Sequence, residues 1–187
     1  MKKLRLIIFI VVALAQISLP ASMIWNRQRT LREGRIWKFR TAPTDPVDAM
    51  RGRYLTLRFA AETFPQREPV PDHGDMLYVK LKEDADGFAV VDEISNEPQS
   101  GNSIVRADNY GYSAGQNRIH FPFDSFWVSE ADAPAAEEAY VEHSRRDKLD
   151  AYVTVRVRGS DAAVEELYLA GQPLRDYLRA HPVATAR

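Results

Sequence analysis

Apolar and polar residues alternate with a period of two along several stretches of the chain, and this pattern predicts half-buried β-strands. The clearest case in the N-terminal half lies within residues 53–62, where Leu55, Leu57 and Phe59 are separated by single residues. Successive side chains of a strand point to opposite faces, so these three are expected on one buried face. Gly52 comes directly before this strand and predicts a turn or bulge there.

The same alternation predicts further strands. They cover residues 35–40, 75–82, 88–94, 104–110, 118–123, 151–157 and 163–169. Asp86-Gly87 fits a tight turn between two of them, because glycine readily adopts the positive φ that such turns need. Helices are expected over residues 133–147, where Pro134 fits the first turn, and over residues 173–178. These elements predict a mainly β (α+β) fold, an antiparallel sheet or open barrel of about seven strands with one packed helix.

The first 25 residues follow a different pattern and predict an N-terminal transmembrane helix. Lys2, Lys3 and Arg5 precede an apolar run over residues 6–25 with few polar interruptions. A helix of this length spans about 30 Å, the thickness of the hydrocarbon core of a bilayer. A cleaved signal peptide is the alternative, because Ala13-Leu14-Ala15 forms an Ala-x-Ala site. A retained anchor is favoured because the apolar character continues past that site.

The chain therefore divides into four parts. They are a transmembrane anchor or signal peptide (residues 1–25), a linker (26–35), a β-rich domain (36–180) and a loose tail (181–187). Basic residues flank both ends of the apolar run, so charge counting alone does not decide which end stays inside the cell.

Composition and charge exclude several function classes. Removing Lys2, Lys3 and Arg5 from the 25 basic residues leaves 22 against 26 acidic ones, a net charge of −4, which argues against nucleic-acid binding. The chain has no cysteine, so disulfides, thiolate metal sites and a cysteine nucleophile are excluded. The four histidines lack the spacing of metal ligands, and no phosphate-binding loop is present, so neither a metal nor a cofactor is predicted.

Two groups of residues are candidates for catalysis, and neither is favoured. His120, Asp124 and Ser125 could form a Ser-His-Asp group, but triad members usually come from distant segments, and His120 is expected in solvent on the outward face of its strand. Asp124 and Glu130 flank aromatic residues that include Trp127, which could form a sugar-stacking groove. Core packing is the favoured interpretation of that aromatic cluster.

Two further features have simple structural explanations. Asp45 and Asp48 could act as an acid–base pair, but an aspartate beside a proline commonly bonds the backbone of its own turn. Arg145, Arg146 and Lys148 follow the predicted helix, where cations favour the helix dipole. We therefore predict a solvated helix end there in preference to a basic binding patch.

Residues 52–59 read Gly-Arg-Tyr-Leu-Thr-Leu-Arg-Phe and resemble the motif Gly-Asp-Tyr-x-x-Leu-x-Tyr. This motif names the GDYXXLXY family of membrane-anchored bacterial proteins. Gly52, Tyr54 and Leu57 match it, whereas Arg53 stands at the acidic position and Phe59 at the second tyrosine. Tyr54 is expected to tie its hydroxyl group to a neighbouring segment.

Other stretches support the resemblance in the same order along the chain. Pro43-Thr44-Asp45-Pro46 resembles a Pro-x-Asp-Pro run that precedes the family motif, and residues 125–130 and 167–174 also agree. The family has no established activity, and the resemblance implies an N-terminal membrane segment and a β-rich domain outside the cytoplasm. The N-terminus is thus expected inside the cell, with a single span in the inner membrane and the domain in the periplasm.

We expect a non-catalytic protein-interaction or envelope-accessory module without a catalytic site, which binds the membrane and a possible envelope protein. The possible binding residues are Asp45, Gly52, Arg53, Tyr54, Leu57, Phe59, Trp127 and Glu130. The alternatives are an envelope hydrolase acting on glycan or peptide and a small-ligand-binding barrel. An enzyme should show a cleft with a shifted pKa in which at least two of five residues converge, namely Asp45, Asp48, Asp124, Glu130 and His120.

Overall fold

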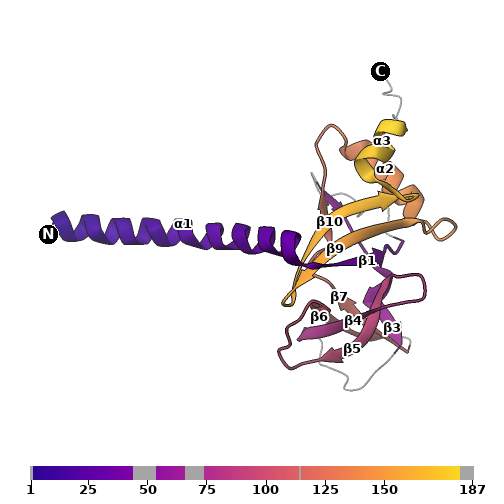
Figure 1. Ribbon diagram of the computed structural model, residues 1–187, viewed down its shortest axis with the longest axis horizontal. Coiled ribbons are helices and arrows are strands. Elements are labelled where there is room, and N and C mark those ends of the chain that lie inside the picture. The colour runs from indigo at the N-terminus through magenta and orange to yellow at the C-terminus, as the bar shows by residue number, and fades with distance from the viewer. Residues whose placement is uncertain (1, 44–53, 66–73, 114, 182–187) are drawn as a thin grey trace.

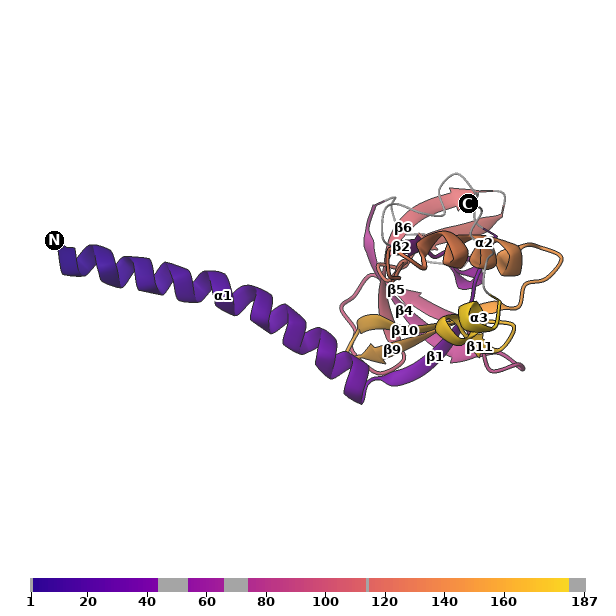
Figure 2. The ribbon, with the colours of Figure 1, turned by 90° about the horizontal axis from the view of Figure 1, so that it is seen from above.

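The computed structural model describes residues 2–43, 54–65, 74–113 and 115–181. These residues form a mainly β fold with a long N-terminal helix, α1 (Lys2–Glu33), and two shorter helices, α2 (Ala133–Ser144) and α3 (Leu174–Ala180). In Figures 1 and 2, α1 projects away from the folded body, and α2 and α3 lie beside each other at one end of it. The predicted fold class, mainly β with an N-terminal helix, is confirmed.

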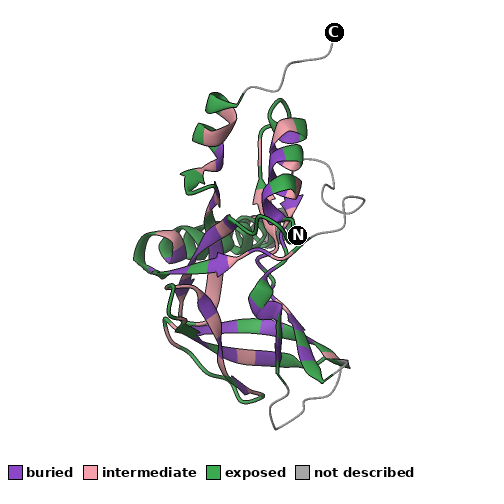
Figure 3. Ribbon diagram, turned by 90° about the vertical axis from the view of Figure 1, so that its right-hand side faces the viewer, coloured by how far each residue is buried: buried purple, intermediate pink, exposed green. Residues whose placement is uncertain are grey.

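The strands form three antiparallel sheets and do not close into a barrel. The first sheet has the order β1 (Arg35–Arg40), β9 (Ala151–Arg158), β10 (Asp161–Leu169) and β11 (Gln172–Pro173). The second has the order β3 (Thr63–Pro65), β7 (Gln116–His120), β6 (Ile104–Ser113), β4 (Met76–Glu83) and β5 (Ala89–Ser95). The third pairs β2 (Tyr54–Thr56) with β8 (Ser125–Trp127). Alternating buried and exposed residues line the strands, as Figure 3 shows.

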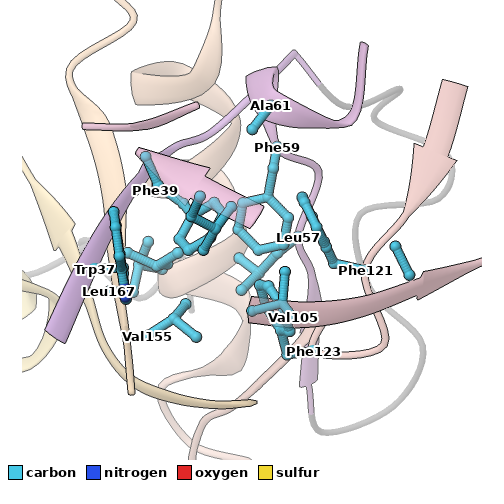
Figure 4. Close-up of a cluster of buried hydrophobic side chains, with 14 of the residues drawn as sticks. Trp37, Phe39, Leu57, Phe59, Ala61, Val105, Phe121, Phe123, Val155 and Leu167 are labelled. Atoms are coloured by element: carbon cyan, nitrogen blue, oxygen red, sulfur yellow. The ribbon is translucent and has the colours of Figure 1, made fainter. Parts of the chain in front are cut away.

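Four phenylalanine rings from separate segments form the centre of the core. Phe39 lies on β1, Phe59 follows β2, and Phe121 and Phe123 lie between β7 and β8. Every pair of these rings is in contact, with centroids 5.0–6.1 Å apart. Figure 4 shows the cluster with Leu57, Val105, Val155 and Leu167 around it. Burying each ring contributes about 1.5–3 kcal/mol, so the cluster holds the three sheets together.

The predicted strand over residues 53–62 is shorter in the structure than its pattern suggested. Its described part pairs with β8 only from Tyr54 to Thr56. The chain then stays extended, forms an isolated bridge between Phe59 and Thr41, and turns into the 3₁₀ helix η1 (Ala60–Glu62). Leu55, Leu57 and Phe59 are nevertheless all buried, as predicted. The backbone stays extended beyond β2, so side chains two residues apart still point to the same face, although the pairing strand changes from β8 to Thr41.

α1 joins the first sheet without a flexible connection. Helix residues continue to Glu33, through most of the region that the sequence suggested as a linker, and β1 begins two residues later. The Glu33 carboxylate accepts a hydrogen bond from Arg158 Nε at 3.0 Å, and Arg156 donates to the Gly34 carbonyl at 3.2 Å. A Cβ atom on Gly34 would lie 2.5 Å from the Thr30 carbonyl oxygen. It would also lie 3.1 Å from the backbone N and O of Val157 on β9, so the last turn of α1 and the backbone of β9 leave little space for a side chain at Gly34.

Within the described residues, one helical segment, Phe9–Glu33, is long and apolar enough to cross a membrane. A signal sequence near an N-terminus meets the same criteria. This segment is compatible with the single membrane anchor predicted from the sequence.

We predict that Gly34→Ala destabilises the protein by forcing the end of α1 away from β9. The midpoint of thermal unfolding should fall by about 2–10 °C, measured by near-ultraviolet circular dichroism of the full chain in detergent micelles. Gly101→Ala is the matched control, because a Cβ atom there meets only Ile104 at 3.6 Å. Equal midpoints for the two variants would contradict the close approach at Gly34.

Candidate functional site

The structure describes five of the eight possible binding residues predicted from the sequence, namely Tyr54, Leu57, Phe59, Trp127 and Glu130. Asp45, Gly52 and Arg53 lie outside the described residues, as does Asp48 of the proposed acid–base pair. Leu57 and Phe59 are core residues with 0% and 2% exposure. The Leu57 N–H donates to the Asp124 carbonyl at 2.6 Å, which links the end of β2 to the start of β8. Packing accounts for these two motif positions.

Tyr54 and Trp127 form an aromatic pair on the two-stranded sheet. They are directly opposite each other on β2 and β8, with ring centroids 5.2 Å apart. Trp127 is 63% exposed, whereas Tyr54 is half-buried. Within the described residues the Tyr54 hydroxyl makes no hydrogen bond, so the expected tie to a neighbouring segment is absent there. Glu130 is exposed in the turn that follows β8.

Glu62, which the sequence analysis missed, organises a buried polar network. Its Oε2 accepts the Phe59 N–H and its Oε1 accepts the Phe121 N–H, both at 3.1 Å. Oε1 also lies 3.2 Å from His120 Nδ1. Burial raises the pKa of the Glu62 carboxyl group, while the two backbone N–H groups and the nearby His120 and Arg58 oppose that rise.

His120 is not free in solvent, and that prediction was wrong. Its side chain is only 17% exposed, and its Nε2 lies 3.4 Å from Asp124 Oδ2 on the side opposite Glu62. The reason is its contact with Glu62, which lies 58 residues earlier in the chain. η1 places the Glu62 carboxylate against β7. Local alternation along β7 carries no information about this contact.

The structure brings the three candidate triad residues together in an order that does not suit nucleophilic catalysis. Ser125 Oγ donates to Asp124 Oδ1 at 2.9 Å, and Asp124 contacts His120 through its other oxygen. A catalytic serine is activated by a hydrogen bond to the histidine, with the carboxylate on the far side of the ring. Here the carboxylate lies between serine and histidine. Within the described part of the chain, no group of three or more His, Cys, Asp or Glu side chains is arranged to hold a metal ion.

An open pocket of about 610 Å³ lies beside this network. Glu62 and His120 line it together with Tyr110 and three arginines, Arg58, Arg118 and Arg146. The arginines come from the extended segment after β2, from β7 and from the turn after α2. Residues so far apart in the chain give no local signal, which is why the sequence analysis did not identify this site.

A second histidine cluster fixes the two short helices. His143 on α2 is 4% exposed, with Nδ1 2.6 Å from Asp150 Oδ1 and Nε2 2.9 Å from the Tyr177 hydroxyl on α3. Tyr177 in turn stacks on His181, with ring centroids 4.3 Å apart. The cluster joins α2 to α3 and the start of β9.

We predict that Glu62→Ala lowers the free energy of unfolding by about 2–4 kcal/mol, because the buried N–H groups of Phe59 and Phe121 lose their acceptor. Urea unfolding of the full chain in micelles measures this. Glu138→Ala on the exposed face of α2 is the control and should change stability by less than about 0.5 kcal/mol.

The pH dependence provides an independent check of the Glu62 assignment. Because its carboxyl pKa is raised above the ordinary 4.5, the folded state holds this proton more tightly than the unfolded chain does. The contribution of Glu62 to the free energy of unfolding should therefore be largest at low pH, where the group is protonated. It should decrease as the pH rises from 4.5 through the raised pKa. Glu62→Ala should lack this decrease. An unchanged pH profile in the variant argues against the assignment.

The comparison with known proteins adds a family assignment to this geometry. A family model described as GDYXXLXY protein matches residues 16–167, which is most of the chain. No curated protein and no solved structure matches it. The matched region covers the end of α1, the two-stranded sheet, the Glu62 network and the β9–β10 hairpin. The chain therefore belongs to the GDYXXLXY protein family.

Proposed function

We propose that this protein is a membrane-anchored module that catalyses no reaction and binds a protein partner in the cell envelope, outside the cytoplasm. The observation that carries the proposal is the Tyr54–Trp127 pair, which presents a largely exposed indole ring on the strand next to the family motif. Trp and Tyr are enriched at protein interfaces and among the residues that dominate binding energy. An exposed indole beside a second aromatic ring suits such a role.

The anchor and the polar network support the same proposal. α1 is long and apolar enough to hold the domain at a membrane, and membership of a family of membrane-anchored proteins supports an N-terminus inside the cell. Ser125 is bonded to Asp124 and not to His120, so a serine-type hydrolase finds no support in this arrangement. The Glu62 carboxylate bonds two backbone N–H groups, which is a structural role.

The topology can be tested directly because the chain contains no cysteine. We predict that Glu138→Cys, on the exposed face of α2, reacts with a membrane-impermeant maleimide in intact spheroplasts. Lys3→Cys, at the other end of α1, should react only after the membrane is permeabilised. The reverse pattern would show that the domain faces the cytoplasm. Mass spectrometry of the labelled chain also shows whether the N-terminal segment is retained.

We predict that Trp127→Ala removes most partner binding while leaving the fold intact. A photo-crosslinking residue at the exposed position Ser129, in the full chain in its own membrane, should give one discrete adduct. Loss of a dominant aromatic contact costs about 2 kcal/mol or more, so Trp127→Ala should reduce the adduct at least about tenfold. Tyr112→Ala is the matched control, because Tyr112 is 50% exposed on a different sheet. Random adducts, or an adduct indifferent to Trp127, would count against the proposal.

A further inference from the structure

The pocket beside Glu62 gathers arginines that form no direct ion pair with a carboxylate of the described residues. Eleven arginines of the described structure lie beyond α1, and seven of them form ion pairs with carboxylates. These seven are Arg35, Arg40, Arg106, Arg145, Arg156, Arg158 and Arg179. The other four are Arg58, Arg118, Arg146 and Arg175. Three of these four line one pocket, where Arg58 also acts electrostatically on Glu62, so positive charge that no direct ion pair with a described residue neutralises is concentrated there.

Arg146 differs in this respect from Arg145 and Lys148, the basic residues near it in the chain. After α2, Arg145 lies 3.5 Å from Asp147 and Lys148 pairs with Glu142, whereas Arg146 between them lines the pocket and makes no ion pair with any described residue. The sequence suggested that this basic run is a solvated helix end. That interpretation fits Arg145 and Lys148, whereas Arg146 lines the pocket.

The charges of the residues that line the pocket indicate what kind of ligand it could bind. Arg58, Arg118 and Arg146 carry three positive charges, and Glu62 is the one carboxylate among the described lining residues. These four described side chains sum to a net charge of +2. Guanidinium groups bind carboxylate and phosphate oxygens through paired hydrogen bonds, and a volume of about 610 Å³ suits a small organic molecule or an acidic side chain.

We propose that this pocket is a binding site for a dianionic oxyanion, a phosphate monoester or a dicarboxylate, held by Arg58, Arg118 and Arg146. This proposal goes beyond the proposed function, because it rests on different residues from the Tyr54–Trp127 pair. Glu62 and His120 form one wall of the site. Since the Glu62 carboxylate is held by the Phe59 and Phe121 N–H groups, this wall is fixed by the aromatic core.

The test is calorimetric titration of the full chain in detergent micelles with inorganic phosphate, succinate and acetate. We expect saturable binding of phosphate or succinate that weakens as salt is raised, with acetate binding at least tenfold more weakly. Phosphate preference assigns a phosphate ester and succinate preference a dicarboxylate. Arg118→Gln and Arg146→Gln should each weaken binding at least tenfold.

Arg145→Gln is the matched control, since Arg145 is adjacent to Arg146 but does not line the pocket. It should change the affinity less than twofold. Arg118→Lys keeps the charge and loses the paired hydrogen bonds, so its affinity should be intermediate. Trp127→Ala should leave anion binding unchanged, which separates this proposal from the proposed function. Binding of neither dianion, or equal losses in the Arg145 and Arg146 variants, overturns it.

Discussion

The contact among Phe39, Phe59, Phe121 and Phe123 is the constraint on which the domain depends. A two-stranded sheet such as β2–β8 is marginal by itself in water. Here the chain continues from β2 into Phe59 and enters β8 from Phe123, so both strands are fixed by rings of the same cluster. The family motif has a tyrosine at the position of Phe59. Phenylalanine places no hydroxyl group in this buried position, so no partner for one is needed.

Glu62 connects that apolar core to the polar network beside it. Its carboxylate fixes the backbone at Phe59 and at Phe121, which are two members of the ring cluster. The same oxygen that accepts the Phe121 N–H also contacts His120, which in turn reaches Asp124 at the entrance to β8. A change at Glu62 therefore acts on the packing of the rings and on the wall of the arginine pocket together.

Local patterns predicted the elements well, and the contacts between them poorly. Alternation in residues 151–157 predicted a half-buried strand, and β9 does bury Val153, Val155 and Val157, because side chains two residues apart point to the same face. The pairing of β1 with β9 joins residues more than a hundred positions apart, and nothing in either strand specifies the other. The Glu62–His120 contact and the convergence of Arg58, Arg118 and Arg146 depend on such pairings. The motif residues were easy to find, but Leu57 and Phe59 turned out to be core.

Because α1 joins the first sheet directly at Gly34, both the height of the helix and its rotation about its own axis determine how the domain is held. The helix turns by about 100° for each residue, so the number of residues between the bilayer surface and Glu33 sets which side of the sheets looks back at the lipid. With residues 6–25 in a bilayer, the polar end of the helix, residues 26–33, adds only about 12 Å of height. With α1 so placed, the domain would lie close above the lipid headgroups with one fixed side turned towards them, and proteins embedded in the same membrane would lie within its reach.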